Sequence, residues 1–562
     1  MDNNELKKCL KASHIITQSY THYGGESGLQ DYGPVGFEIK RKLLDVWIKR
    51  FVKSSNNIRQ VEIPTLVPAQ ILGRSGHTVK FYDYVMYHDD KCYRVDHLIK
   101  DHYNSSTISA PLLKNVETMT ESEMEAYVWD NNILPRDCII QKKHLMFETS
   151  GKYLRPELAQ GIFVNFNSYF DFFRQKLPFG IAQVGKSYRD EISPKPFVRL
   201  REFSQAELEY FVDPSCKTHP LYNYIKDVEL PLLNADMQIR NINMMSIRIG
   251  DAIDHKIISH ELMAYFLNQI YQFALEIGLD KSKIRFRQHL PEEKAHYAIE
   301  CWDLEANVDG HWLECVGCAD RGDYDLTCHN IKDSSICKRN LEKDEYTESV
   351  VYKININKKC ISKKYGPLTQ SIASYFDSLS QEEIKDLEAP LTIRLDDQTL
   401  VICDEMFSIT AENIIVKHMK FIPHVLEPSF GIDRLMYAVL EHSFIIRDNT
   451  KYVLKLNNNL TPYDCALFNL TDNDETISIY DALLNKLKNE KLDVFTEDSS
   501  VNIGKKYIRA DQIGVKYCIT IDPASFASRA VTIRDRDTKE QISVSLDNME
   551  RLLEFIKLML KQ

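Results

Sequence analysis

The feature that most constrains the fold is a pair of extended stretches on either side of a proline-rich turn. Residues 179–188 and 199–212 both lack the apolar spacing of an amphipathic helix, and the turn at 193–196 contains two prolines. This pattern predicts two antiparallel strands joined by a loop. Residues two apart in a strand point to one face, so we expect Arg189 and Glu191 to share a face near the loop. The chain must therefore form a β-sheet that carries charges at one end of a hairpin.

The second strand of this hairpin continues the charged pattern. Arg199, Phe203 and Glu207 follow at intervals of four residues, which keeps them on one face of a strand. A solvated hairpin with cross-strand salt bridges is the simpler interpretation of this segment taken alone. A second segment, near residue 430, favours a binding site instead.

That second segment is a strand that runs directly into a helix. The apolar stretch 421–426 leads into 427–431, and the following residues have helical apolar spacing, with Arg434 in the first turn. A cation there opposes the helix dipole, so a purely structural helix would gain nothing from it. A site for a polyphosphate would use this cation, since phosphates bind at helix N-termini.

A phosphate-binding loop is an alternative interpretation of the first strand. Residues 180–187 match the P-loop pattern GxxxxGK[ST] letter for letter, which would make the chain a P-loop ATPase. A P-loop needs a strand before its first glycine and a helix after its lysine. Here Pro178 closely precedes the match and Pro194 would stop a long helix. The context therefore favours a strand.

The length of 562 residues requires several domains, and a composition of 44% hydrophobic and 27% charged residues is that of a folded protein. An Asn-rich stretch after residue 450, followed by Pro462, indicates a linker. Two polar stretches are typical of insertions within a larger domain. The expected parts are a core made of 1–99, 144–332 and 401–450, insertions at 100–143 and 333–400, and a C-terminal domain over 451–562.

The composition also indicates a cytoplasmic protein without a membrane segment. No run approaches 18 apolar residues, and residues 2–5 are polar or acidic where a signal peptide would be basic. The 13 cysteines are odd in number and irregularly spaced, so most are expected to be reduced thiols. A net charge of −11 still permits a local basic face for a nucleic acid. Lys505, Lys506 and Arg509 are the best cluster for such a face.

A zinc site is one possible interpretation of the cysteines at 315–337. Cys315 and Cys318 have the spacing of half a common ligand set, and Cys328, His329 and Cys337 follow. The first pair lies in an expected strand, where alternation points neighbouring side chains apart, and the later group lacks CxxC spacing. Ordinary buried thiols are therefore favoured.

The order of these segments resembles the three signature motifs of class II aminoacyl-tRNA synthetases. Residues 33–64, with the pattern of a helix leading into a strand, are similar to motif 1. Arg189-x-Glu191 is similar to the start of motif 2, and residues 431–434 are similar to motif 3. The class I signatures HxGH and KMSKS are absent from the sequence.

Finer matches resemble glycyl-tRNA synthetases of the homodimeric eukaryotic and archaeal type. The matching stretches are 23–28, 31–36, 153–157, 189–194, 316–321, 427–431, 500–507 and 534–537. The resemblance implies an α/β (α+β) fold, with an antiparallel catalytic sheet, flanking helices, two insertions and a C-terminal α/β anticodon-binding domain. It also implies a homodimer that joins glycine to tRNA(Gly).

The resemblance implies roles in ATP binding as well. Activation is an in-line attack of the glycine carboxylate on the α-phosphate, which needs positioning and charge neutralisation more than a general base. Arg189 would hold the α-phosphate and the carboxylate, Glu191 would meet the adenine amino group, and Phe203 would stack on adenine. Arg199 and Arg434 would hold the triphosphate, and the expected catalytic set is Arg189, Glu191 and Arg434. The implied ATP site also includes Asp190, Leu200, Glu314 and Cys315, with Glu314 as a ligand for Mg²⁺.

Glycine offers no side chain, so its pocket must hold the ammonium and exclude a β-carbon by crowding. The resemblance assigns this pocket to Glu157, Glu207, Glu427, Pro428 and Ser429. Two positions depart from the usual family pattern: Leu158 replaces a threonine, and Asp433 replaces a glycine beside the key arginine. A catalytically inactive, synthetase-like RNA-binding protein is the other alternative function, and the intact Arg189, Glu191 and Arg434 disfavour it.

Overall fold

The computed structural model describes residues 3–105, 116, 119–295, 298–331, 333–341, 346–395, 398–448, 451–471, 473–497, 501–547 and 549–561. The chain forms two compact units, one made of Met1–Ser335 with Ile422–Gln562 and the other of Ile336–Phe421. Residues 332 and 450, at which two of the expected domain boundaries fall, lie outside the described residues.

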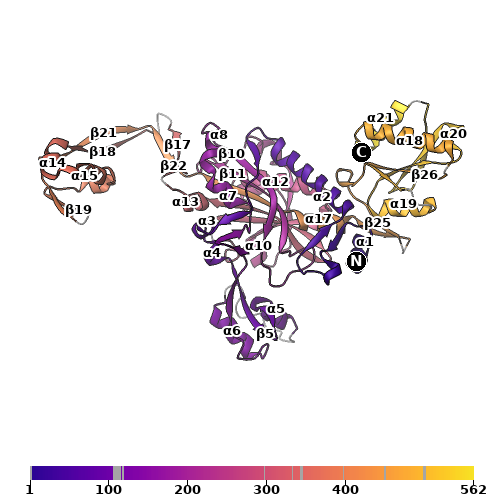
Figure 1. Cartoon of the computed structure of the whole chain (residues 1–562), viewed down its shortest axis with the longest axis horizontal. Coiled ribbons are helices and arrows are strands. Elements are labelled where there is room, and N and C mark those ends of the chain that lie inside the picture. The colour runs from indigo at the N-terminus through magenta and orange to yellow at the C-terminus, as the bar shows by residue number, and fades with distance from the viewer. Residues whose placement is uncertain are drawn as a thin grey trace. The chain divides into compact units, whose positions relative to one another are not determined.

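A large, mainly antiparallel sheet dominates the first unit, in agreement with the predicted fold class (Figure 1). Nine strands within the described residues form it, in the order β13-β12-β14-β15-β16-β23-β11-β10-β3. Only the β10–β3 and β12–β14 pairs of this sheet are parallel. The strands are β3 Ile58–Val61, β10 Phe179–Tyr188, β11 Glu202–Val212, β12 Glu229–Leu233, β13 Met245–Arg248, β14 Ile284–Gln288, β15 Glu300–Val308, β16 His311–Gly322 and β23 His424–Gly431.

The predicted hairpin is β10 paired with β11, in a continuous register from Phe179 opposite Phe211 to Tyr188 opposite Glu202. Residues 180–187 lie inside β10, so the P-loop alternative is wrong. The return strand begins at Glu202 rather than at residue 199, because a bridge between Lys195 and Arg199 closes the intervening loop on itself.

Three helices cover one face of the sheet: α2 Pro34–Trp47, α12 Glu261–Glu276 and α17 Ile432–Ser443. Helix α2 begins at Pro34, with Gly33 as its N-cap residue, and a π-helix, Ile48–Lys53, continues it. Gly36 allows α2 to pack closely against the backbone at Ile15, since a Cβ at position 36 would lie 1.9 Å from the Ile15 carbonyl oxygen. The Trp47 ring meets the Phe430 ring edge-on at a centroid distance of 5.7 Å. The helices thus bury the apolar face of the sheet.

The next strand after α2 is β3, which ends at Val61 and so lies slightly earlier than the predicted 61–64. The longest of the described helices, α12 and α18 Asp474–Asn489, each have 16 residues. None of the described helices is long and apolar enough to cross a membrane.

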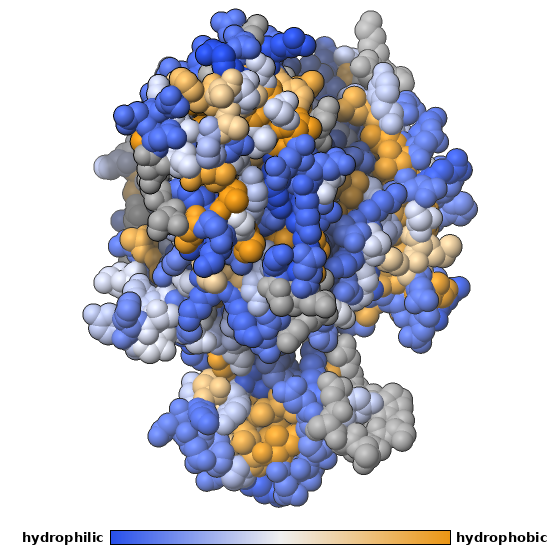
Figure 2. All heavy atoms as spheres, turned by 90° about the vertical axis from the view of Figure 1, so that its right-hand side faces the viewer, coloured by the Kyte–Doolittle hydropathy of each residue, from blue (hydrophilic) through white to orange (hydrophobic). Residues whose placement is uncertain are grey.

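A small lobe departs from the core between β3 and β10. It contains β5 Tyr82–His88, β6 Lys91–Arg94, α5 Val95–Ser105, α6 Glu121–Asp130 and β7 Gln141–His144. Strand β5 pairs with both β6 and β7, so the lobe starts well before residue 100. It has its own apolar core, and Figure 2 shows hydrophobic residues gathered on one side of it, at the bottom of the view.

The second unit is a separate α+β structure with its own core. Strand β18 Thr347–Ile356 pairs along its whole length with β21 Phe407–Val416. The segment expected to end at residue 400 therefore continues to Phe421, because its last strands return to pair with its first. Its other elements are β17 Cys337–Asn340, α14 Lys358–Tyr365, α15 Thr369–Asp377, α16 Gln381–Lys385, β19 Leu391–Leu395, β20 Gln398–Ile402 and β22 His418–Phe421.

The C-terminal part is an α/β domain, as predicted. Its described strands form a sheet in the order β27-β26-β28-β29-β30, parallel at β27, β26 and β28 and antiparallel beyond. The elements are β26 Cys465–Asn469, α18, β27 Val494–Thr496, α19 Ile503–Gln512, β28 Tyr517–Ile521, β29 Ala530–Asp535, β30 Gln541–Ser545 and α21 Met549–Lys561.

Candidate active site

A cavity of about 280 Å³ opens on the sheet face opposite the three helices. Strand alternation explains its lining: Trp302, Leu304 and Val316 point into the apolar core, and their neighbours along the strands point into the cavity. The residues that the sheet contributes are Cys301 and Asp303 from β15, Glu314, Cys315, Gly317 and Ala319 from β16, Glu427, Ser429 and Gly431 from β23, and Phe203, Ser204, Gln205 and Glu207 from β11.

Cross-strand register makes the hollow. Asp303 lies opposite Gly317, Gly317 opposite Ser429, and Ser429 opposite Glu207, which forms one row across four strands. Gly317 has no side chain, so the row has a gap at its centre, with the polar side chains of Asp303 and Ser429 on either side of it. The pocket is therefore shaped by the alternation of small and acidic residues in neighbouring strands.

Most of the residues expected in the site line this one cavity. They are Glu157, Arg189, Glu191, Arg199, Leu200, Phe203, Glu207, Glu314, Cys315, Glu427, Ser429 and Arg434. Asp190 lies outside the lining, where its Oδ2 is 3.3 Å from Lys143 Nζ. Pro428 also lies outside it, because it falls between two residues that face the cavity in β23.

A β-bulge lets two consecutive residues of β16 face the cavity. Leu304 pairs with Val316 but Glu305 pairs with Glu314, so Cys315 is the extra residue. Glu314 and Cys315 both line the cavity as a result. Strict alternation would have turned one of them toward the helices.

Three arginines form the basic end of the cavity. The Arg189 guanidinium lies between two aromatic rings, 5.3 Å from the centroid of Phe81 and 5.3 Å from that of Phe203. Arg434 donates from Nε to the Val198 carbonyl oxygen and from Nη1 to the Glu314 carbonyl oxygen, both at 3.0 Å. Arg199 contributes the third guanidinium. Forked, permanently charged donors of this kind suit phosphate oxygens.

Asp433, the acid beside Arg434, is held by partners on three other elements. It accepts hydrogen bonds from Lys40 Nζ at 2.8 Å, from the Tyr32 hydroxyl at 2.5 Å and from the Ser204 amide at 2.6 Å. Its side chain is only 5% exposed. Burial raises the pKa of Tyr32 well above its usual value, and the charge of Asp433 adds to the effect. The carboxylate of Asp433 is therefore satisfied away from Arg434, which leaves that guanidinium for the cavity.

The acidic end of the cavity is tightly hydrogen-bonded. Glu207 accepts from the Leu158 amide at 2.8 Å through Oε2 and from the Ser429 hydroxyl at 2.9 Å through Oε1. Glu427 accepts from Arg321 Nη1 at 2.7 Å. Leu158 thus meets the pocket through its backbone, so the loss of a side-chain hydroxyl there leaves this contact intact.

The acids of this pocket differ in pKa. Burial raises the pKa of Glu207 to about 8, and the negative charges of Glu427 and Glu157 add to the rise. Burial likewise raises the pKa of Glu427 to about 6, although Arg321 opposes it. For Glu157, burial is outweighed by His77, Arg321 and Gln160, which lower its pKa. The pocket has excess acid and would gain from a bound cation such as an ammonium.

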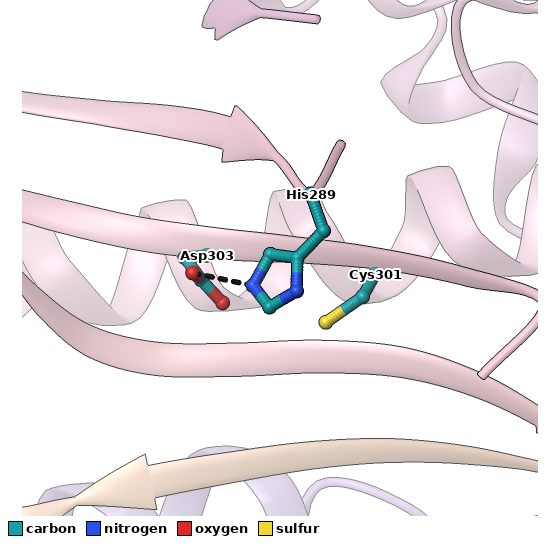
Figure 3. A group of neighbouring side chains, drawn as sticks. All are labelled: His289, Cys301 and Asp303. Carbon is teal, nitrogen blue, oxygen red and sulfur yellow. Dashed lines mark hydrogen bonds and ion pairs between the residues drawn. The ribbon is translucent and has the colours of Figure 1, made fainter. Parts of the chain in front are cut away.

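Sequence reasoning missed several polar residues of this site, among them Gln205, His289, Cys301 and Asp303. His289 follows β14 directly, and its Nε2 lies 2.7 Å from Asp303 Oδ2 (Figure 3). Burial raises the pKa of Asp303 to about 6; the hydrogen bond from His289 opposes this and the charge of Glu314 adds to it. The period-two pattern of Cys301 and Asp303 was the signal available in the sequence.

The basic cluster expected in the C-terminal domain is only partly correct. Lys506 is buried and donates to the Glu497 carbonyl oxygen at 3.0 Å, so its assignment to a surface face is wrong. Arg509 is exposed but forms an ion pair with Glu497. Lys505 is exposed on α19.

Comparison with known proteins places the chain in a family. The family model "tRNA synthetase class II core domain (G, H, P, S and T)" matches residues 147–443, and the model "Anticodon binding domain" matches residues 464–555. With its antiparallel sheet, three arginines and acidic pocket, the chain belongs to the class II aminoacyl-tRNA synthetases.

Relatives that match nearly the whole chain identify the family more closely than the domain models do. The chain is 38% identical to the glycine–tRNA ligase of Methanocaldococcus jannaschii, over 98% of both chains. It is 36% identical to the glycine–tRNA ligase of Pyrococcus abyssi, over 98% of this chain and 97% of the relative. It is also 36% identical to the glycine–tRNA ligase of Methanothrix thermoacetophila, over 94% of this chain and 92% of the relative. The chain is a member of the glycine–tRNA ligase family.

Proposed function

We propose that this chain activates glycine with ATP and transfers it to the 3′ end of tRNA(Gly), as a homodimer in the cytoplasm. The observation that carries the proposal is the division of the cavity into an acidic end and a basic end. One end suits an ammonium without a side chain, and the other suits a polyphosphate. The reacting groups of glycine and ATP would meet between them.

The acidic end supports selection of glycine. Glu207, Glu427 and Glu157 would bind the ammonium, and the Ser429 hydroxyl fixes Glu207 in place. Pro428 lies between Glu427 and Ser429 in β23, on the side of the strand that faces away from the cavity. Because Glu207, Ser429 and Gln205 crowd the floor of the pocket, a β-carbon would meet side chains already in contact. Alanine and serine should therefore be rejected.

The basic end supports ATP binding. Arg189 would hold the α-phosphate and the attacking carboxylate, and Arg199 and Arg434 would hold the β- and γ-phosphates. Phe203 offers an aromatic ring on which adenine would stack. Glu191 lines the same cavity and would accept a hydrogen bond from the adenine amino group. Leu200 and Cys315 add apolar contacts to the walls, and Asp190 orders the loop through Lys143. Catalysis here consists of positioning and neutralising charge.

Mg²⁺ fits the donors next to this end of the cavity. Glu314 is partly exposed and negatively charged, and its pKa is held low because Arg434, His289 and Arg189 outweigh its burial. A carboxylate on the rim of a phosphate site is the usual protein ligand for Mg²⁺, with water and phosphate oxygens as the others. The ion would supply charge neutralisation for the phosphates when ATP is bound.

The remaining parts support binding of tRNA and a second subunit. The C-terminal α/β domain would bind the anticodon region, with Lys505 as one exposed cation. Helix α2 bears an exposed Phe37, which is 58% accessible, next to the apolar stretch of motif 1. An apolar residue of this kind on motif 1 is suited to a subunit interface.

The proposal is tested by ATP–pyrophosphate exchange with each of the standard amino acids, followed by charging of tRNA(Gly). Glycine should drive exchange, whereas alanine and serine should give little. Exchange without any preference for glycine would contradict the proposed substrate. No exchange with any amino acid, together with tight tRNA binding, would favour the inactive RNA-binding alternative.

A further inference from the structure

We propose that His289 and Cys301 bind a divalent transition-metal ion, with Zn²⁺ as the best-suited one, in the wall of the cavity, and that Asp303 orients the histidine. The three residues line the cavity together, and each offers one ligand atom within 4.8 Å of the others. The proposal does not depend on which amino acid the chain activates.

Two neighbouring strands bring these side chains together. Cys301 and Asp303 lie two residues apart in β15, so both point to the cavity face. His289 follows the end of β14, where its amide donates to the Cys301 carbonyl oxygen at 3.0 Å. The cluster is therefore held by the rigid sheet. A metal site requires its ligands to be positioned precisely, and strands provide this better than loops do.

The imidazole of His289 has a free, buried nitrogen aimed at the cysteine. Its Nε2 is hydrogen-bonded to Asp303 Oδ2 at 2.7 Å, which assigns the ring proton to Nε2. Its Nδ1 is buried and has no hydrogen-bond partner within the described part of the chain. Figure 3 shows that Nδ1 faces the Cys301 sulfur and Nε2 faces Asp303.

An unpaired buried nitrogen is costly, and a metal ion would satisfy it. Zn²⁺ binds imidazole nitrogen at about 2.0–2.1 Å and thiolate sulfur at about 2.3 Å, so two such ligands lie within about 4.4 Å of each other. The Asp303 carboxylate would orient the imidazole through Oδ2, as carboxylates commonly do for a metal-binding histidine. A nitrogen and a sulfur ligand favour Zn²⁺ over Mg²⁺, which prefers oxygen alone.

Two carboxylates, those of Asp303 and Glu314, line the same cavity and would stabilise a bound cation, although Arg287 Nη2 lies 3.7 Å from Asp303 Oδ2 and partly neutralises them. Two protein ligands leave two positions of a tetrahedral ion open to water or another bound group. These positions would face the cavity, where Gly317 and Ala319 leave room beside the acidic pocket.

Cobalt substitution tests the site directly. The full-length protein is stripped of metal with a chelator and titrated with Co²⁺, and the thiolate-to-Co²⁺ charge-transfer absorption is recorded. We expect one equivalent of Co²⁺ to give this band and Zn²⁺ to displace it. Cys301→Ser should abolish the band, and Asp303→Asn should weaken binding by about 10- to 100-fold, as is usual for a carboxylate that supports a metal ligand.

Two matched variants make the outcome decisive. Cys315→Ser removes another thiol of the same cavity, and Glu314→Gln removes the carboxylate proposed for Mg²⁺; both should keep the cobalt band. Thermal unfolding of every variant checks that the fold is retained. A wild-type protein that gives no thiolate band, or a band that persists in a folded Cys301→Ser variant, overturns the proposal.

Discussion

The acidic end of the cavity is nearly closed to solvent, whereas the basic end remains partly open. Glu207 is 1% exposed and its two oxygens accept several hydrogen bonds from the protein. Arg434 is 30% exposed and its guanidinium donates to two backbone carbonyl oxygens. A site for a small, invariant ammonium can be built in advance. A site for a long polyphosphate must stay accessible, with arginines held by contacts that phosphate oxygens can replace.

The largest expected effect is on glycine-dependent pyrophosphate exchange, and it tests whether ATP binds at the basic end of the cavity or at the P-loop-like sequence in β10. Arg434→Ala should slow glycine-dependent pyrophosphate exchange by about a hundredfold or more, the usual loss for one transition-state donor. Lys186→Ala is the matched control, since Lys186 lies in the strand and pairs with Glu202 at 3.2 Å. Similar losses in both variants would contradict the assignment of the phosphate site.

The pH dependence should distinguish the two ends next. Glu207 has a pKa of about 8, so below pH 8 it is largely neutral in the free protein and must lose a proton to pair with an ammonium. The KM for glycine should therefore fall as pH rises from 6 to 8, by up to about tenfold per pH unit. The KM for ATP should change much less, because guanidinium groups stay charged throughout this range.

The Glu207→Gln variant provides the control for this profile. It cannot titrate, so its glycine KM should be high at every pH and lack the slope. A wild-type glycine KM that does not change between pH 6 and pH 8 would show that Glu207 does not bind the ammonium as a carboxylate.

A smaller effect should come from the hydroxyl that orients the acid. Ser429→Ala removes a hydrogen bond of 2.9 Å to Glu207 and should raise the glycine KM by about five- to tenfold, since such a bond contributes about 1 kcal/mol. Ser246→Ala is a matched control, because Ser246 donates to Glu229 on the exposed edge of the sheet. An unchanged KM for Ser429→Ala would mean that Glu207 is held without this hydroxyl.

The smallest effect concerns the C-terminal domain. Lys505→Glu should weaken tRNA binding a few-fold at moderate salt and reduce the salt slope by about one, as expected for one lost phosphate contact. Pyrophosphate exchange should be unchanged. If the salt dependence of tRNA binding also stays the same, this face of α19 does not contact RNA.

The sequence predicted local structure and the charged segments well. The β10–β11 hairpin, the helix with Arg434 in its first turn and the core helix α2 follow from residue spacing, because period and turn chemistry act over short distances. Strand β10 ends at Tyr188, so Arg189 and Glu191 lie just beyond it and not within the strand as expected. Twelve expected side chains meet in the cavity because those short elements pair in one sheet.

Other features could not be predicted, because they depend on which strands become neighbours. The bulge at Cys315 appears only in the register between β15 and β16. His289 and Asp303 meet because two strands lie side by side, and Lys506 is buried because it reaches the carbonyl oxygen of Glu497. The end of the second unit at Phe421 is set by pairing with strands formed many residues earlier.

The ion pair between Lys40 and Asp433 has a consequence for how the sequence can change. These residues are 393 positions apart, yet each is the other's charge partner in a buried setting. Removing one partner alone would leave a buried charge uncompensated, at a cost of about 3–5 kcal/mol. The two positions should therefore change together: a glycine at 433 would be tolerated when the lysine at 40 is replaced by an uncharged residue in the same step.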